Sequence, residues 1–265
     1  MIDTSAKLKV TASAEKNYWG YVQTREFMEL VSQMEEAKKK TITKTLICNT
    51  GKGKTYAVKK FRGSFPAYTW VVTINSLMKL GDIINAFLGM LGLPEKGSRA
   101  MRMSSIVAHI KDLRRSGHRP MLILDEGENM TNETMRLLKG LYDGICEEGH
   151  ASIVLIGTDQ LLKKMERSRR RDREAGPQFY RRFKAGIRVI REMPVEKAFV
   201  PFFEKFGVAD KGLRRLLCEL CENYGELNAY LEPALRETDE RGGELTEAFF
   251  RVMYNMPCQS IVGSR

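Results

Sequence analysis

Residues 45–58, TLICNTGKGKTYAV, place a glycine-rich turn between two apolar segments. The segment before the turn reads as a short buried strand, and a helix is expected from about Thr55 to Phe61. Gly51 and Gly53 let the backbone curl so that successive N–H groups point at an anion, next to the positive end of the following helix. The final Gly-Lys-Thr matches the P-loop pattern, which predicts a nucleotide phosphate site.

The residues expected to bind ATP follow one another along this turn. Lys54 would reach the β- and γ-phosphates, and the Thr55 hydroxyl would ligate Mg²⁺. Cys48 stands where the pattern has its first glycine. That position shapes the exit from the strand more than it touches phosphate, so binding is still expected. The predicted set is Asn49, Thr50, Gly51, Lys52, Gly53, Lys54, Thr55 and Tyr56.

A second apolar segment, MLILDE at 121–126, ends in two acids. Ligands gather at the carboxyl ends of strands in a parallel sheet, so Asp125 is expected beside the P-loop, where it would hold Mg²⁺ with Thr55. Glu126 would then orient or deprotonate the water that attacks the γ-phosphate. The two segments together predict an ATPase with Mg²⁺ as its cofactor.

The remaining apolar pattern predicts an α/β fold, a parallel sheet flanked by helices, followed by a small all-α lid. Strands are expected at 43–48, 67–73, 119–126, 151–157 and 186–191, with a helix over 131–148, a loop at 175–177 and a short helix at 179–183. From Val195 onward only helices are expected, at 196–206, 210–223, 226–237 and 244–254. We therefore predict a flexible arm at 1–17, an α/β domain at 18–194, the lid at 195–256 and a tail at 257–265.

Basic residues outnumber acidic ones by 44 to 33, which gives a formal net charge of +11. A surplus of this size favours a polyanionic partner, nucleic acid first. The chain has no apolar run of eighteen residues and no secretory signal pattern at its start, so we expect a cytoplasmic protein without membrane contact.

The order of these segments resembles the AAA+ ATPases. More narrowly it resembles the transposition ATPases that include the Mu transposition protein B, TniB, TnsC and the IstB helper. The resemblance covers about residues 18–235 and rests on TLICNTGKGKT (45–55), MLILDE (121–126), VLIGTD (154–159), QFYRRF (178–183) and YVQTREF (21–27). It implies a homo-oligomer, a ring or helical filament on double-stranded DNA, that binds largely without sequence preference and directs a transposase to its target.

The resemblance also implies roles for further residues. Thr158 corresponds to sensor 1, which reports on the γ-phosphate, and Arg181 and Arg182 to the arginine finger of a neighbouring subunit, with Arg182 preferred. Asn228 stands where relatives carry a phosphate-contacting arginine, so either Arg214 or Arg215 substitutes for it or this contact is absent.

Candidate DNA contacts lie between the second strand and MLILDE, where inserts of the resembled family face DNA: Lys79, Arg99 and Arg102. The basic run KKMERSRRRDR (163–173) could contact DNA or an acidic partner, or could be a solvated face. The aromatic residues Tyr18, Trp19 and Tyr21 could stack on adenine or pack in the core.

Three other functions are open at this point. A replicative helicase loader would be a small AAA+ protein that binds a helicase and prefers single strands. A P-loop kinase would use Arg181 or Arg182 within its own site and bind no DNA. A nucleotide-gated scaffold would hydrolyse ATP weakly, as the Cys48 and Asn228 departures suggest.

Overall fold

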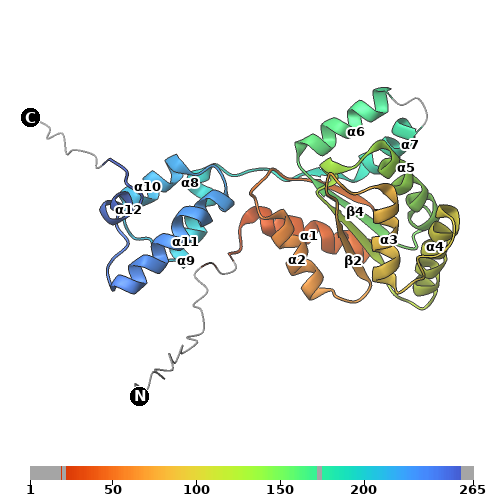
Figure 1. Ribbon diagram of the computed structural model, residues 1–265, viewed down its shortest axis with the longest axis horizontal. Helices are drawn as coiled ribbons and strands as arrows, with labels where there is room; N and C mark the ends of the chain where they lie inside the picture. The colour runs from red at the N-terminus through yellow and green to blue at the C-terminus, as the bar shows by residue number, and fades with distance from the viewer. Residues whose placement is uncertain (1–18, 20–21, 172–174, 258–265) are drawn as a thin grey trace, which may run out of the picture.

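A computed structural model describes Trp19, residues 22–171 and residues 175–257 (Figure 1). The predictions for the arm at 1–17, for Tyr18 and Tyr21, for residues 172–173 of the basic run and for the tail beyond residue 257 lie outside the described residues. Among the described helices, none is long and apolar enough to cross a lipid bilayer.

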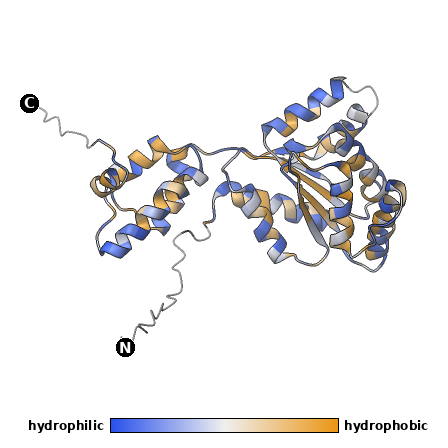
Figure 2. Cartoon of the chain, viewed as in Figure 1, coloured by the Kyte–Doolittle hydropathy of each residue, from blue (hydrophilic) through white to orange (hydrophobic). Residues whose placement is uncertain are grey.

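Five parallel strands form the predicted sheet, in the order β2-β3-β4-β1-β5. Neighbouring strands pair in register, for example Leu46 with Ile156 and Leu124 with Leu155. The strands are β1 Lys44–Ile47, β2 Thr69–Thr73, β3 Met121–Asp125, β4 Ser152–Gly157 and β5 Ile187–Val189. Successive β3 residues enter different hydrophobic clusters, Met121 and Ile123 on one face and Leu122 and Leu124 on the other. A strand buried on both faces is apolar throughout, as Figure 2 shows for the sheet.

Two helices cover one face of the sheet: α1 (Arg25–Lys40) and α2 (Lys54–Ser64). Thr24 caps α1, because its hydroxyl accepts a hydrogen bond from the Phe27 N–H at 3.2 Å. The other face carries α3 (Leu80–Leu91), α4 (Arg99–Arg115), α5 (Asn132–Leu141), α6 (Asp159–Arg171) and α7 (Ala175–Phe183). Short 3₁₀ turns follow β3 (Gly127–Asn129) and α7 (Lys184–Gly186).

Two expected boundaries on this second face were wrong. The helix expected over 131–148 passes after Leu141 into a π-helical turn, Tyr142–Cys146. The loop expected at 175–177 is the first turn of α7, where Pro177 is tolerated because the first helical N–H groups have no partner within the helix. Gly176 allows α7 to pack closely on α6, since a Cβ there would lie 2.1 Å from the Ser168 carbonyl oxygen.

After Met193 the described chain is helical, with its own hydrophobic cluster of residues between Ala198 and Phe250. Its helices are α8 Val195–Ala198, α9 Val200–Lys205, α10 Lys211–Leu220, α11 Tyr224–Arg241 and α12 Glu247–Met253. The single helix expected at 196–206 is broken at Phe199, and Pro201 lies in the first turn of α9. We call residues 195–256 the lid.

Candidate nucleotide site

The P-loop lies at the carboxyl end of β1, which is between β4 and the edge strand β5. Gly51 and Gly53 adopt the left-handed conformation, with φ of 73° and 80°, which glycine adopts without steric cost. Lys54 begins α2, and its ammonium donates to the Asn49 carbonyl oxygen at 2.9 Å. The Lys54 ammonium thus binds its own loop. The phosphate oxygens of a nucleotide would replace the Asn49 carbonyl oxygen as its acceptor.

Thr55, which follows β1, and Asp125, which ends β3, meet at the carboxyl edge of the sheet, although β4 lies between these two strands. The Thr55 hydroxyl donates to Asp125 Oδ2 at 3.1 Å, and the Glu126 N–H donates to Asp125 Oδ1 at 2.9 Å. Asp125 is buried, and burial raises the pKa of its carboxyl above the ordinary value. A hydroxyl and a carboxylate are the oxygen ligands that Mg²⁺ takes in proteins, so these two residues fit the cation.

Glu126 follows directly in the left-handed conformation, with φ of 55°, unusual for a residue with a side chain. Asn129 holds its carboxylate, because its amide donates to Glu126 Oε2 at 3.3 Å and to the Ile74 carbonyl oxygen at 2.9 Å. The contact joins the candidate base to the residue after β2. Sequence reasoning missed Asn129, and a polar residue one turn beyond the two acids was the available signal.

Thr158 lies at the carboxyl end of β4 and is buried. Its N–H donates to Glu128 Oε2 at 3.2 Å, while its hydroxyl has no hydrogen-bond partner within the described part of the chain. A buried hydroxyl without a partner is costly unless a ligand or water satisfies it. Glu128, the third acid of the DEGE segment, was also missed from sequence.

A cavity of about 320 Å³ opens beside Gly51, Lys52 and Gly53. Its other walls are largely aromatic: Trp19, Phe27, Tyr56, Phe202 and Tyr224. Trp19 stacks on two lid rings, Phe202 and Phe206, with centroids 5.1 Å apart in each case. Flat aromatic walls beside a phosphate loop suit a nucleobase. A second cavity, of about 410 Å³, is lined by residues that include Asn49, Thr50 and Thr158. We call these two cavities the P-loop cavities.

The lid touches the P-loop directly. The Tyr224 N–H donates to the Gly51 carbonyl oxygen at 3.1 Å, and the Lys52 ammonium donates to the Glu222 carbonyl oxygen at 3.1 Å. Asn223 lies so close that a Cβ on Gly51 would be 2.4 Å from its side chain. Gly51 is thus required both by its φ and by the approach of the lid.

Asn228 lines the aromatic cavity, whereas the two candidate arginines of the lid, Arg214 and Arg215, are engaged elsewhere. Arg214 donates to the Val208 carbonyl oxygen at 2.6 Å, and Arg215 pairs with Glu219 at 3.3 Å. No arginine is among the described residues that line either of the two P-loop cavities. The geometry therefore gives no support to a lid arginine as the substitute for Asn228.

The two candidate finger residues have different surroundings on α7. Arg182 is 13% exposed and forms an ion pair through Nε with Asp143 of the π-helical turn. Arg181 is exposed. Neither arginine lines the P-loop cavities, so the structure does not bring them to the nucleotide site of their own chain.

The three candidate DNA contacts also differ. Lys79 and Arg99 are exposed, just before α3 and at the start of α4. Arg102 is half-buried and donates to Asn85 Oδ1 of α3, which makes it a link between the two helices.

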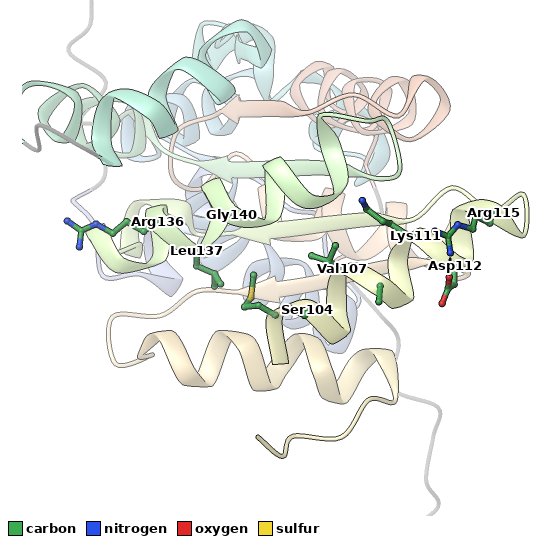
Figure 3. A pocket seen from close by; sticks show the side chains of 10 residues that line it. Ser104, Val107, Lys111, Asp112, Arg115, Arg136, Leu137 and Gly140 are labelled. Carbon is green, nitrogen blue, oxygen red and sulfur yellow. Dashed lines mark hydrogen bonds and ion pairs between the residues drawn. The ribbon is translucent and has the colours of Figure 1, made fainter. Parts of the chain in front are cut away.

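A shallow groove of about 660 Å³ lies further along α4, against α5 (Figure 3). Arg136 lies at one end and Lys111 and Arg115 at the other, with Val107 and Leu137 between them. Lys111 pairs with Glu148 at 3.2 Å and Arg115 with Asp112 at 2.7 Å. The groove contains no P-loop residue and is separate from the nucleotide site.

Comparison with known proteins agrees with this geometry. Residues 43–165 match the family described as an AAA domain. This part of the chain resembles an AAA domain. The Mu-like prophage FluMu DNA transposition protein B of Haemophilus influenzae is 30% identical over 177 residues, which cover 62% of this chain and 57% of that protein. This relative confirms the resemblance to the AAA+ transposition ATPases, although the chain spans little more than half of its length.

Solved structures confirm the fold. Cdc6p from Pyrobaculum aerophilum has a TM-score of 0.58 at 14% identity and covers 84% of this chain and 65% of that one. The ORC1 protein of Aeropyrum pernix, solved in complex with DNA, has a TM-score of 0.60 at 15% identity and covers 91% and 67%. Both likenesses concern the P-loop α/β architecture and the helical region after it.

Proposed function

We propose that this chain hydrolyses ATP and, in its ATP-bound state, assembles on double-stranded DNA to direct a transposase to its target. The observation that carries the proposal is the contact between Thr55 and Asp125, because it brings a P-loop hydroxyl and a strand-end carboxylate together at the carboxyl edge of the sheet. The same edge carries Glu126 and Thr158.

Each residue of this edge would do one task in hydrolysis. Thr55 and Asp125 would hold Mg²⁺, which when bound would supply positive charge to offset that of the phosphates. Lys54 would exchange the Asn49 carbonyl oxygen for phosphate oxygens. Glu126, oriented by Asn129, would take the proton of the attacking water.

The Thr158 hydroxyl would bond the γ-phosphate or the attacking water, which would satisfy the donor that is otherwise buried without a partner. Thr158 would in this way report on the γ-phosphate as sensor 1, since loss of the γ-phosphate on hydrolysis would leave its hydroxyl unpaired again.

We propose that an arginine from a neighbouring copy completes the site, and that Arg181 is this arginine. It is exposed on α7, whereas Arg182 is held by Asp143. A residue that must leave an internal ion pair would lose that pair's energy before it could act in another subunit. The active form would therefore be an oligomer, a ring or a helical filament.

The distribution of charge supports DNA binding by the α/β domain. Residues 18–194 carry a net charge of +13, while the lid, residues 195–256, carries −4. Lysine and arginine contacts with phosphates give affinity without sequence preference, which suits a protein that accepts many target sites. Lys79 and Arg99 are the exposed candidates, and α6 adds further basic residues.

The transposase partner rests on the relative's name, DNA transposition protein B. The helicase-loader alternative shares the fold, and a preference for single strands would identify it. The nucleotide-gated scaffold is favoured by one observation, the absence of arginine among the described walls of the P-loop cavities, because a weak hydrolase needs no such contact.

ATP turnover with and without random-sequence duplex DNA tests the proposal. We expect duplex to stimulate turnover, and we expect Lys54→Ala to abolish it. Lys59→Ala, which removes an exposed lysine of the same helix, is the matched control and should behave as the wild type. Turnover that persists in Lys54→Ala would remove the P-loop from the mechanism. ATP binding without turnover, with or without duplex, would favour the scaffold.

A further inference from the structure

Glu26 is a fully buried acid in the first turn of α1. Its two carboxylate oxygens accept hydrogen bonds from two different places. Oε1 accepts from the Met193 N–H at 3.2 Å, and Oε2 accepts from the Tyr224 hydroxyl at 2.8 Å. Met193 lies in the connection from β5 to the lid, two residues before α8, and Tyr224 begins α11.

Tyr224 itself makes three kinds of contact where the lid meets the α/β domain. Its N–H bonds the Gly51 carbonyl oxygen, its ring lies 5.1 Å from the Phe202 ring and 5.5 Å from the Lys52 ammonium, and its hydroxyl reaches Glu26. Burial and the bond to Glu26 raise the pKa of Tyr224, so it stays a hydroxyl donor. One residue thus joins the P-loop, the aromatic cavity and α1.

A buried carboxylate is costly unless hydrogen bonds or an opposite charge compensate it. Among the described residues no lysine or arginine pairs with Glu26, so the Tyr224 hydroxyl of the lid, the Met193 N–H just before the lid and the N-terminal end of α1 supply the compensation. If the lid moved off the P-loop, the Tyr224 hydroxyl would leave with it and the carboxylate would lose one of its two described donors. The energetics of Glu26 therefore depend on where the lid lies.

We infer that Glu26 is a positioning residue that docks the lid on the P-loop, by holding Met193 and Tyr224 at once, and so sets the affinity for ATP. The ATP part of this inference rests on the proposed function, while the docking part does not. Nucleotide would enter a site whose lid contact at Gly51 is already made. Lid opening for nucleotide exchange would require the bond between Tyr224 and Glu26 to break.

Hydrogen–deuterium exchange in the nucleotide-free protein tests the docking directly. We expect Glu26→Ala to speed exchange of the backbone amides of residues 222–228 about tenfold, while the buried strand at 121–125 keeps its protection. Glu26→Gln, which retains an acceptor for Met193, should lie between Glu26→Ala and the wild type. Tyr224→Phe, which loses only the hydroxyl, serves if Glu26→Ala does not fold. Glu35→Ala, an exposed acid on the same helix, is the matched control.

A fluorescent ATP analogue then tests the coupling. We expect Glu26→Ala to weaken its binding about tenfold in Mg²⁺ buffer, and the double variant with Tyr224→Phe to be no weaker than Glu26→Ala alone. Equal exchange and equal affinity in Glu26→Ala and Glu35→Ala would overturn the inference. A wild type that binds no analogue, while residues 222–228 still respond to Glu26→Ala, would instead contradict the proposed function and leave the docking role standing.

Discussion

The Thr55 hydroxyl donates a hydrogen bond to Asp125 Oδ2 across 3.1 Å, although seventy residues separate the two in the chain. The bond joins the first turn of α2 to the carboxyl end of β3. Burial raises the pKa of Asp125, so the ionised carboxylate is unfavourable there until a cation compensates it. We therefore expect Asp125 to lower the stability of the fold when no cation is bound beside it.

Replacement of Asp125 by asparagine tests whether the buried carboxylate lowers the stability of the metal-free protein. Because the folded-state pKa of Asp125 lies above its ordinary value of 3.8, its contribution to stability falls as pH rises through the raised value. Without Mg²⁺ and nucleotide, Asp125→Asn should raise the Tm at neutral pH, and the gain should shrink as pH falls toward 3.8. Calorimetry at several pH values measures it. Asp112→Asn, in an exposed ion pair, should change the Tm little at any of them.

The two α7 arginines should separate activity from stability. Arg181→Ala should lower turnover in the assembled state by about 10³-fold or more and leave the Tm unchanged, as expected for an arginine finger. Arg182→Ala should cost about 1 kcal/mol of unfolding free energy, because it removes the ion pair with Asp143 and leaves that carboxylate with Lys139 alone. Mixing Arg181→Ala with Lys54→Ala should restore part of the activity. No recovery on mixing would contradict a finger acting between subunits.

The exposed cations just before α3 and at the start of α4, Lys79 and Arg99, should act through DNA phosphates. Lys79→Ala and Arg99→Ala should each weaken duplex binding equally for all sequences and reduce the slope of log affinity against log salt by about 1. Lys197→Ala, an exposed lysine of the acidic lid, should leave the slope unchanged. Arg102→Ala should lower stability through the lost bond to Asn85. A slope that stays the same in both Lys79 and Arg99 variants would place the DNA elsewhere.

Asn228 offers a gain-of-function test. If hydrolysis is slow because the described walls near the phosphates contain no arginine, Asn228→Arg should raise the rate of ATP turnover about tenfold, by adding positive charge near the transferred phosphoryl group. Asn228→Met, of similar length without the charge, should not raise it. Single-turnover kinetics with both variants distinguish faster chemistry from faster product release, and an unchanged chemical step in Asn228→Arg would remove this explanation.

The fold was predictable because its signals are local. Thr24 marks the start of α1, Gly51 and Gly53 mark a turn with positive φ, and apolar runs such as 121–125 mark strands buried on both faces. The 175–177 error arose because Ala-Gly-Pro is typical of loops, while the close packing of Gly176 on Ser168 is a tertiary contact that no local pattern reveals.

The residues of the site also fall into those that local motifs predict and those that only tertiary contacts reveal. The pair of Thr55 and Asp125 follows from two motifs at the edge of one parallel sheet. The roles of Asn129, of the Asp143 partner of Arg182 and of Glu26 beneath the lid depend on contacts between segments 3, 39 and 198 residues apart, respectively. For the last two, the sequence contains no pattern that names the partner, because a buried ion pair or hydrogen bond requires only that two side chains meet.

The central claim is that ATP controls assembly on duplex DNA, and fluorescence anisotropy with a labelled random-sequence duplex tests it most directly. Binding should be measured with ATP, with ADP and without nucleotide, each at two salt concentrations. The account predicts cooperative binding with ATP, much weaker binding in the other two states, and a marked loss of affinity at the higher salt concentration. Binding that is absent, or equal in all three nucleotide states, would contradict it.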